Sequence, residues 1–435
     1  MSKGGGSVEG LNTRSPTIGE LLGGLEELER ERNLRFLRNL FKRFYEQEAV
    51  FEKVTSIKYR EFGFLTLETR TMIRHLSFED WRDLVKFLCE KVPADCYRST
   101  AYYLNPSAPN MEGKGWLGAD LVFDIDADHI QTSCKRRHDR WRCLDCGENG
   151  NGSAPENCPK CGSKRIDERA WFCSECLEAA KTETIKLLEF LYSDFGLTDQ
   201  EISLYFSGHR GYHVHVESEE FKVLDQDARR EIVDYITGLG IDPLVHGLGS
   251  LTSDEELAKA LKFSTWAERL MKNGYDIVLN YGLEDLLRIG VKDKVASSIV
   301  ENKEKIVELW WRGKFNQMVG VDSRTWEAIF LEAARKSGVL IDTVVTADVH
   351  RLIRLEGTLH SKTGLRKVKV LRDLESFDPL KEAVTFKKGE VKVHVYESPE
   401  FRVGESTFGP YSEVDIELPI SAAVLLVCKG LAYVI

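Results

Sequence analysis

The stretch GADLVFDIDAD, residues 118–128, decides the fold and points to the chemistry of this chain. Alternate residues of a β-strand share a face, so its apolar residues are expected in a core while Asp124 and Asp126 project together from the opposite face. Carboxylates about 7 Å apart along a strand repel each other unless a cation lies between them, and Mg²⁺ prefers such oxygen ligands. The stretch therefore predicts a strand with a divalent-metal site. The alternative is a polar edge strand with solvated aspartates.

Predicted strands and helices alternate on both sides of this stretch. A two-residue alternation of apolar and polar residues predicts strands, and apolar residues at helical spacing predict helices. The expected strands are at 57–67, 71–76, 121–126, 202–206 and 212–217, and the expected helices are at 18–51, 77–92 and 177–195. Ser77 is expected to cap the second helix. The pattern predicts an α/β (α+β) fold with mixed sheets.

The composition of the 435-residue chain limits its class. Apolar residues make up 42% and charged residues 30%, which excludes wholesale disorder, collagen and a simple coiled coil. The 70 acidic and 60 basic residues give a net charge of −10, which excludes a uniformly basic nucleic-acid coat but leaves local basic patches open. The longest apolar stretch, around Ala422–Val427, is far shorter than the roughly 20 residues of a membrane span, and the N-terminus lacks a signal-peptide core. We expect a soluble, cytoplasmic protein without a membrane partner.

A glycine-rich turn lies in SGHRGYHVHV, residues 207–216. Gly208 and Gly211 permit a tight turn between two strands, and His213 and His215 alternate onto one face. The turn predicts a phosphate cradle built from backbone N–H groups, an arginine fork and a histidine donor. The alternative is an ordinary hairpin with a solvated histidine face.

Residues 351–372 form a basic segment within this acidic chain. One acidic residue, Glu356, stands against Arg351, Arg354, Lys362, Arg366, Lys367, Lys369 and Arg372. The segment predicts a surface for phosphates, with a solvated face as the alternative.

Seven of the ten cysteines fall between residues 134 and 176. Three pairs have Cys-x₂-Cys spacing, and Cys134 and His138 precede them; the pairs are Cys143/Cys146, Cys158/Cys161 and Cys173/Cys176. In an intracellular protein this spacing predicts structural Zn²⁺ rather than disulfides or free thiols. A basic flank could face nucleic-acid phosphates; it comprises Lys135, Arg136, Arg137, Arg140 and Arg142. The remaining cysteines are expected to pack as ordinary interior residues; they are Cys89, Cys96 and Cys428.

The chain resembles the catalytic (small) subunit of archaeal and eukaryotic DNA primase, and it is closest to the archaeal form. The resemblance covers about residues 34–435 and rests on YREFGF (59–64), MIRHLSF (72–78), DLVFDIDAD, SGHRGYH, RLIRLEGTLHSKTG (351–364) and LPISAAVLLVCKG (418–430). It implies a primase-type catalytic fold with a helical insertion and a zinc module. The implied activity is synthesis of short RNA or DNA primers on single-stranded DNA from nucleoside triphosphates. It also implies Mg²⁺ or Mn²⁺ as catalytic ions and an iron–sulfur-containing large subunit as partner.

The resemblance further implies roles for individual residues. The expected catalytic and metal-binding residues are Asp124, Asp126 and Asp342, the last preferred over Asp348 by its spacing to His360. The expected nucleotide-binding residues are Ser207, Arg210, His213, Arg354 and His360. Arg60 and Arg74 are candidates for the same pocket. Two positions depart from the family pattern: His209 replaces an arginine common in relatives, which would weaken one phosphate contact, and Glu356 replaces a proline, which would alter its loop.

The resemblance also suggests how the zinc ligands pair. In the family a Cys and a His precede a Cys-x₂-Cys that opens a helix, which here implies an outer site of Cys134, His138, Cys173 and Cys176. The remaining four cysteines would form an inserted ribbon site: Cys143, Cys146, Cys158 and Cys161. Seven cysteines and one histidine make two sets of four. The alternative is sequential pairing, with the first four ligands in one site and the last four in the other.

The expected domains follow from these assignments. They are a flexible tail at 1–17, a catalytic body at 18–133 and 177–223, a zinc-binding module at 134–176, a helical insertion at 224–337 and the C-terminal part of the body at 338–435. Two rival functions are a non-catalytic zinc-ribbon nucleic-acid-binding protein and a metal-dependent phosphohydrolase. A third acidic residue before a basic phosphate motif argues against the first. Two separated triphosphate-binding clusters argue against the second.

Overall fold

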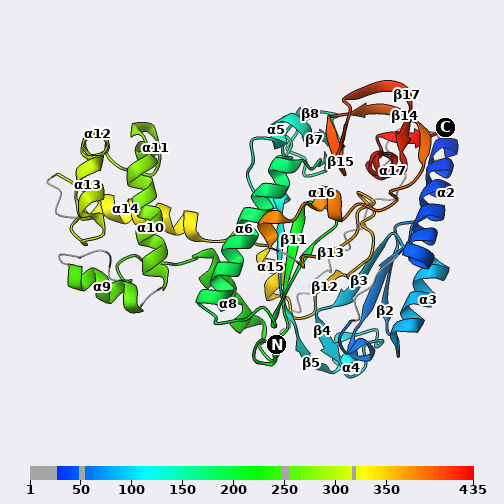
Figure 1. Cartoon of the computed structure of the whole chain (residues 1–435), viewed down its shortest axis with the longest axis horizontal. Coiled ribbons are helices and arrows are strands. Elements are labelled where there is room, and N and C mark those ends of the chain that lie inside the picture. Colours follow the sequence, from blue (N-terminus) through cyan, green and yellow to red (C-terminus); the bar gives the residue numbers. More distant parts are fainter. Residues whose placement is uncertain are drawn as a thin grey trace, which may run out of the picture.

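The computed structural model describes residues 27–48, 54–246, 248, 254–263, 265–315, 320–371 and 373–435. Figure 1 shows a mixed α/β body and a group of helices at one end of the longest axis. The predicted tail at 1–17 lies outside the described residues, as does the beginning of the helix expected at 18–51. That helix is seen as α2 (Glu27–Arg43), followed by the π-helical turn η1 (Phe44–Glu48).

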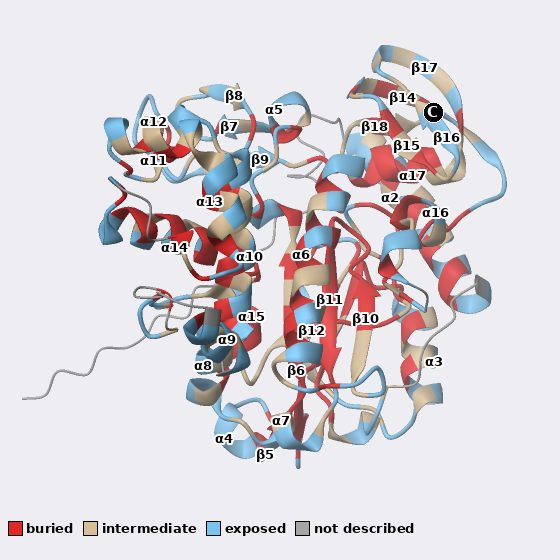
Figure 2. Ribbon diagram, turned by 60° about the vertical axis from the view of Figure 1, so that its left-hand side comes forward, coloured by how far each residue is buried: buried red, intermediate tan, exposed pale blue. Residues whose placement is uncertain are grey.

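The central sheet of the body, here the site sheet, has four antiparallel strands in the order β13-β10-β11-β6. The strands are β6 (Leu121–Asp126), β10 (Ile202–Phe206), β11 (Gly211–Val216) and β13 (Val368–Lys369). Leu121, Phe123 and Ile125 are fully buried while Asp124 and Asp126 are partly exposed, which confirms the predicted alternation. Helix α6 (Ser174–Ser193) packs on β6 and β11, and Figure 2 shows the strands buried behind it.

A second antiparallel sheet has the order β12-β3-β1-β2. Its strands are β1 (Phe62–Leu65), β2 (Met72–Leu76), β3 (Asp95–Ser99) and β12 (Leu352–Arg354). Helix α3 (Trp81–Lys91) begins at Asp80, whose Oδ1 accepts from Arg82 N at 2.7 Å and from Asp83 N at 3.1 Å. The predicted cap at Ser77 is therefore wrong, because a carboxylate three residues later satisfies the free N–H groups.

One C-terminal segment joins the two sheets. β12 pairs with β3 in the second sheet, and β13, some fourteen residues further on, pairs with β10 in the site sheet. The turn and the basic segment, far apart in the sequence, are thereby brought to one place.

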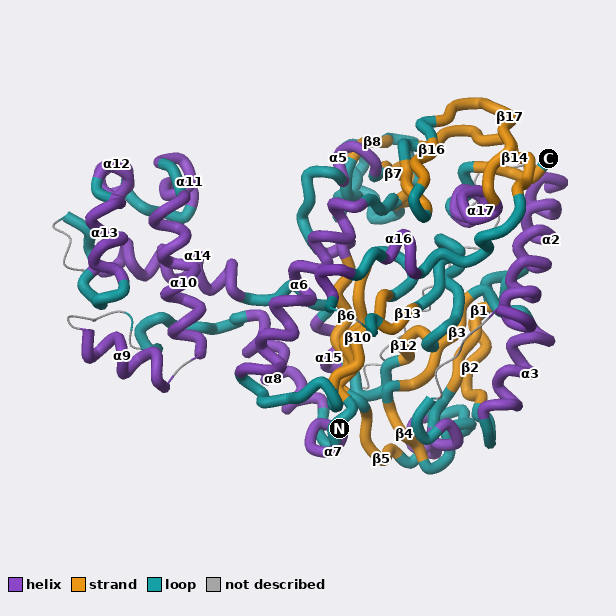
Figure 3. The backbone as a smooth tube through the Cα atoms, in the orientation of Figure 1, coloured by secondary structure: helices purple, strands orange, loops and turns teal. Residues whose placement is uncertain are grey.

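The predicted helical insertion contains α8 (Gln226–Thr237), α9 (Asp254–Phe263), α10 (Thr265–Asn280), α11 (Leu283–Arg288), α12 (Asp293–Glu301), α13 (Lys303–Trp310) and α14 (Ser323–Ser337). Trp310 is fully buried there, with its ring centroid 4.5 Å from that of Phe315. A Cβ on Gly274 would lie 2.9 Å from Trp310 Cζ2, so glycine permits this close packing. Figures 1 and 3 show α9–α14 away from the body, whereas α8 packs on α15 (Thr343–Ala347) of the body.

The zinc module and the C-terminal segment carry smaller sheets. The module contains α5 (Lys135–His138), β7 (Arg140–Cys143), β8 (Asn149–Asn151) and β9 (Ile166–Arg169). The C-terminal sheet has the order β17-β14-β18 and is covered by the buried helix α17 (Ile420–Cys428); its strands are β14 (Glu390–Ser398), β17 (Tyr411–Pro419) and β18 (Ala432–Val434). Asn33 of α2 ties this sheet to the N-terminal helix through Ala432 O at 3.0 Å.

The remaining elements are short. They are η2 (Ile57–Tyr59), β4 (Ala101–Tyr103), α4 (Met111–Lys114), β5 (Trp116–Ala119), η3 (Ala127–His129), α7 (Glu219–Lys222), η5 (Leu374–Ser376), α16 (Pro379–Glu382), β15 (Phe401–Val403) and β16 (Ser406–Phe408). In the described part of the chain, every helix is too short or too polar to span a lipid bilayer.

Candidate functional site

The acidic end of β6 is the chemical centre of the candidate site. The side chains of Asp124 and Asp126 are 25% and 29% exposed, so both remain accessible to an ion. Asp124 stands opposite His213 of β11, with Oδ1 3.5 Å from His213 Nε2. Burial and the nearby carboxylates of Asp126 and Asp342 raise the pKa of Asp124 to about 7. A bound cation would relieve this repulsion and favour the ionised form.

The structure brings Asp342, and not Asp348, to this pair. The backbone N–H of Asp342 donates to Asp124 O at 2.8 Å. Its Oδ1 accepts from the backbone N–H groups of Val344 and Val345 at 3.0 and 3.1 Å, so the side chain caps α15. Asp348 lies at the other end of α15. Among the described residues, only the two Cys/His sets discussed below have all ligand atoms within 4.8 Å of one another, so the three carboxylates are more widely spaced than a zinc site.

The glycine-rich turn folds back onto β6. Ser207 Oγ accepts from the N–H groups of His209 and Gly211, both at 3.3 Å. A Cβ on Gly211 would lie 2.1 Å from Ile125 O, so only glycine admits this close pairing with the acidic strand. Gly208 has φ of 87°, the left-handed region that favours glycine. The alternative of a solvated histidine face is wrong, because His213 and His215 are 6% and 0% exposed.

Arg210 is held between the carboxylates and the zinc module. The residue is 1% exposed; its Nε lies 3.7 Å from Asp126 Oδ1, and its guanidinium also contacts Asp128. Its Nη1 donates to Trp171 O at 2.7 Å and lies 3.6 Å from Asp139 Oδ2. The Nε atom has no hydrogen-bond partner in the protein. Arg210 is therefore fixed in position, with its buried Nε directed at Asp126.

The basic loop after β12 packs directly on this turn. Thr363 Oγ1 donates to Gly208 O at 2.6 Å, and the His209 and His360 rings stack with centroids 4.9 Å apart. Burial first, and neighbouring cations second, hold the pKa values of His209, His213 and His360 well below the ordinary value. These histidines are thus neutral at physiological pH and offer hydrogen bonds rather than charge.

Arg354 supplies charge to the same loop. It is 8% exposed, and its Nη1 lies 2.6 Å from Asp95 Oδ1. Burial acts to raise the pKa of Asp95, but Arg354 and Arg70 lower it to about 2. Ser361 Oγ also donates to Asp95, at 2.6 Å. Of the five predicted nucleotide-binding residues, Ser207 and Arg210 lie in the turn and His213 on β11, while Arg354 ends β12 and His360 lies in the loop after it.

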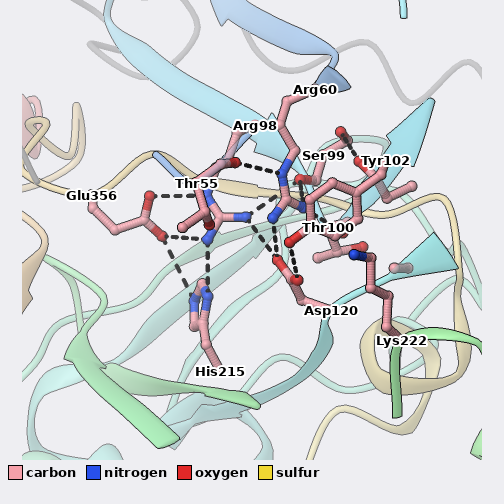
Figure 4. Close-up of polar contacts among 12 residues, drawn as sticks. Thr55, Arg60, Arg98, Ser99, Thr100, Tyr102, Asp120, His215, Lys222 and Glu356 are labelled. Carbon is pink, nitrogen blue, oxygen red and sulfur yellow. Dashed lines mark hydrogen bonds and ion pairs between the residues drawn. The ribbon is translucent and has the colours of Figure 1, made fainter. Parts of the chain in front are cut away.

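Arg60 and Glu356 belong to a buried ionic network that joins the two sheets (Figure 4). Arg60 Nη2 donates to Asp120 Oδ2 at 2.6 Å and Arg98 Nη1 to the same oxygen at 3.3 Å. Arg98 also forms a two-point pair with Glu356, at 3.0 and 3.1 Å. Arg60 is fully buried in this network and does not reach the turn. Arg74, the second pocket candidate, is an exposed partner of Glu61.

The same ionic network includes Lys367, which is buried next to Arg354 and His215. Lys367 Nζ lies 3.1 Å from Glu356 Oε1, 3.2 Å from His215 Nε2 and 2.9 Å from Arg354 O. Burial lowers the pKa of Lys367 to about 8. Glu356 was expected to alter its loop because relatives have proline there. In the structure its carboxylate carries the negative charge that pairs with the buried cations Arg98 and Lys367.

Replacing Glu356 by Gln should lower the free energy of unfolding by about 3–5 kcal/mol, because Arg98 and Lys367 would lose a buried counter-charge. Urea unfolding followed by circular dichroism measures this change. The exposed Glu390→Gln on β14 is the matched control and should change stability by less than about 0.5 kcal/mol. A loss below about 1 kcal/mol in Glu356→Gln would show that the network is not a stabilising element.

The zinc-type ligands converge in two nested sets. Cys134, His138, Cys173 and Cys176 form one set, and Cys143, Cys146, Cys158 and Cys161 form the other. Cys134 Sγ and Cys176 Sγ are 3.4 Å apart, and the pairs Cys143–Cys161 and Cys146–Cys158 are each 3.6 Å apart. Sulfurs 2.3 Å from a tetrahedral centre are about 3.8 Å apart, so both sets fit Zn²⁺. The nested prediction is confirmed and the sequential alternative is wrong.

The two sets should bind metal independently, since the segment that holds the ribbon set lies between the ligands of the outer set in the sequence. Deleting residues 143–161 should lower the zinc content from about two ions to about one per chain and leave a folded catalytic body. Metal analysis by atomic emission, together with a thermal melt, checks both outcomes. Loss of all zinc on deletion would mean that the two sets depend on each other.

The basic segment is not one surface. Arg354 and Lys367 are buried, Lys362 is exposed, Arg351, Arg366 and Lys369 are partly buried, and Arg372 lies outside the described residues. Sequence reasoning missed Arg70, Asp95, Arg98, Asp120 and Asp139, all buried partners of site residues. No local pattern marks them, because Arg98 and Glu356, for example, are 258 residues apart.

An acidic strand that faces a glycine turn and a basic loop is an arrangement suited to a divalent cation beside phosphate groups. A family model for the DNA primase small subunit matches residues 162–372 of the chain. The DNA primase small subunit PriS of Methanothrix thermoacetophila is 36% identical over 92% of this chain and 98% of its own length. Those of Nitrosopumilus maritimus and Archaeoglobus fulgidus are 32% and 35% identical, over 92% and 91% of the chain and 99% and 97% of their own lengths.

The chain therefore belongs to the DNA primase small subunit family, whose members are the catalytic subunits of primase. It is an enzyme of DNA replication, a transferase with the mixed α/β fold expected of that family. The comparisons give no support to the alternative of a non-catalytic zinc-ribbon protein.

Proposed function

We propose that this chain joins nucleoside triphosphates into short primers on single-stranded DNA, with Asp124, Asp126 and Asp342 as the catalytic carboxylates. The observation that carries the proposal is the meeting of these acids with the glycine turn and the basic loop on one sheet. The carboxylates are suited to a divalent cation, and the turn and the basic loop are suited to phosphates. A non-catalytic nucleic-acid-binding module would not need a cation site beside a phosphate site.

The carboxylates fit divalent ions on physical grounds. The pKa of Asp124 is raised because the carboxyl is buried and because Asp126 and Asp342 lie nearby, so this site favours the gain of a cation. Oxygen ligands of this kind suit Mg²⁺ and Mn²⁺. Two such ions would activate the attacking 3′-hydroxyl oxygen and stabilise the leaving pyrophosphate of an in-line displacement at the α-phosphate. Asp124, Asp126 and Asp342 would hold them.

The protein's own groups would position the triphosphate. Ser207 offers its hydroxyl as a donor, because its oxygen already accepts from two N–H groups of the turn, and His213 and His360 add neutral donors. Arg210 and Arg354 supply permanent charge from fixed positions. Such preorganised groups need no rearrangement when charge develops on the phosphates. For structural ions, the outer and ribbon sets are proposed to take Zn²⁺, since their sulfur and nitrogen ligands lie at tetrahedral spacing.

Primer synthesis on an unprimed single strand tests the proposal. The full chain is incubated with single-stranded template, Mg²⁺ or Mn²⁺, and either ribonucleotides or deoxyribonucleotides, and the products are resolved on a denaturing gel. Short products that need template and divalent ion support the function. Hydrolysis of triphosphates without polymer would favour the phosphohydrolase, and binding of DNA without any turnover would favour the zinc-ribbon binding module.

A large subunit is the proposed partner, as the family resemblance implies. The chain's clustered cysteines are all used by the two zinc-type sets, which leaves no such cluster for an iron–sulfur centre among the described residues. We expect initiation on unprimed template to be slower without that subunit, because it would add template and initiating-nucleotide contacts. Comparing initiation with and without it, using extension of a preformed primer as control, tests this. Equal initiation rates and primer lengths would contradict the partnership. The chain is proposed to act in the cytoplasm, at replication forks.

A further inference from the structure

The terminal helix α17 delivers a lysine to the glycine-rich turn. Lys429 caps the helix, and its Nζ lies 3.3 Å from His209 Nε2 and donates to Ala170 O at 2.9 Å. The ammonium group also lies 5.8 Å from the centroid of the Trp171 ring. Lys429 thus contacts the turn at His209. It belongs to the motif at 418–430, none of whose residues is among those proposed above for catalysis or phosphate binding.

The position of Lys429 is fixed by packing. Residues 422–428 of α17 are all buried, and the helix contacts the loop that carries His360. Gly364 in that loop has φ of 72°, and a Cβ there would lie 2.3 Å from Val424 Cγ1. Helix and loop are therefore in close contact, so the lysine and His360 keep a constant separation.

Lys429 joins a group of cations beside the glycine-rich turn. His209, Lys362 and Lys429 line a cavity of about 420 Å³ between the zinc module, the turn and α17. Burial, and then repulsion by Lys362 and Arg210, lower the pKa of Lys429 to about 7. The cavity as a whole is lined by four carboxylates, Asp128, Asp167, Glu168 and Glu397, against five cations, Arg137, Arg140, Arg169, Lys362 and Lys429. Asp128 faces Arg210, and Asp167 lies 3.7 Å from Arg169. The charged groups that act most strongly on His209 are the cations Lys429, Lys362 and Arg354, so this corner is the basic part of the cavity and is suited to an anion.

We propose that Lys429 is a further phosphate-binding residue, which acts with His209 and Lys362 on the end of the nucleoside triphosphate remote from the carboxylates. The proposal rests on the proposed function of the site. His209 is neutral and contributes a hydrogen bond only, so Lys429, which a bound phosphate would hold in its protonated form, supplies the charge at this corner of the turn. The terminal motif then serves nucleotide binding as well as packing.

Binding by the full chain of a nucleoside triphosphate with a methylene bridge between its α- and β-phosphates tests the assignment, with a nucleoside monophosphate for comparison. Lys429→Gln keeps a donor for Ala170 O but removes the charge. It should weaken triphosphate binding about tenfold and monophosphate binding less than about twofold. Lys429→Arg should stay within about threefold of the wild type. The exposed Lys392→Gln is the matched control and should bind as the wild type does.

The outcomes separate this assignment from the function on which it rests. Equal triphosphate affinity in Lys429→Gln and the wild type would overturn the role of Lys429 alone, provided that the wild type binds. Equal losses for triphosphate and monophosphate would also overturn it, since a structural change moves both. Failure of Lys429→Arg to restore affinity would show that charge is not the cause. A wild type that binds no triphosphate would overturn both proposals.

Discussion

Replacing Asp124 by Asn is expected to reduce primer synthesis by at least about a thousandfold while the protein stays folded, since a lost metal ligand costs several kcal/mol in the transition state. Asn has the same shape and keeps a polar contact with His213, so the β6–β11 pairing should persist. Removing a carboxylate that is crowded by two others should not destabilise the fold. The measurement is the steady-state rate of nucleotide incorporation, with a thermal melt of the same preparation.

The other aspartates provide the controls for this experiment. Asp126→Asn and Asp342→Asn should match Asp124→Asn, because all three acids are proposed to hold the ions. Asp348→Asn should retain most activity, since Asp348 caps the far end of α15 and bonds to His350 N at 2.8 Å. A folded Asp124→Asn that extends primers near the wild-type rate would refute the assignment. Inactive Asp348→Asn beside active Asp342→Asn would show that the third carboxylate is misassigned.

Loss of the outer metal should be the second largest effect. Cys173→Ser is expected to remove one zinc ion, lower the melting temperature and reduce primer synthesis about a hundredfold. The reason is a chain of contacts from the outer set to the site. His138 Nδ1 lies 2.8 Å from Asp139 Oδ1, the same carboxylate also accepts from Trp171 N at 2.8 Å, and its Oδ2 lies 3.6 Å from Arg210 Nη1. Cys173 also stands at the N-cap of α6, which covers the site sheet.

The ribbon cysteines give a matched control of the same chemistry. Cys158→Ser should also remove one zinc ion. In the described part of the chain the ribbon cysteines form no hydrogen bond with Arg210 or α6, so activity should fall by less than about threefold. Zinc content, melting temperature and incorporation rate are measured on both variants. Equal loss of activity in the two would show that the outer set has no special link to the catalytic residues.

The acidic strand and the nested cysteines were open to prediction because their signals are local. The two-residue period of Leu121–Asp126 determines which side chains face the core. The spacing of the Cys pairs indicates zinc binding, and the resemblance implies which ligands share a site. The structure groups the ligands in the same way. Helix α6 begins three residues before the predicted 177, because the helix starts directly after the ligand Cys173.

The buried partners of the site could not be predicted, because their contacts join residues far apart in the chain. Asp95 meets Arg354 across 259 positions, and Lys429 meets His209 across 220. Arg60 was considered for the pocket because it lies in an early family motif, and its buried partner Asp120 lies 60 positions further on. A solvated face was the alternative for the histidines of β11, because no local pattern shows that they are buried. The β13 and β12 segments that cover them lie more than 130 residues further on.

Template-directed choice of nucleotide tests the central claim most directly. The full chain, with Mg²⁺ or Mn²⁺, is given an oligo(dT) single strand and one nucleoside triphosphate at a time, and the polymer formed is measured. The account predicts product with adenosine nucleotides, little with the other three, and none without template or divalent ion. Incorporation that is equal for all four nucleotides, or that is independent of the template, would contradict it.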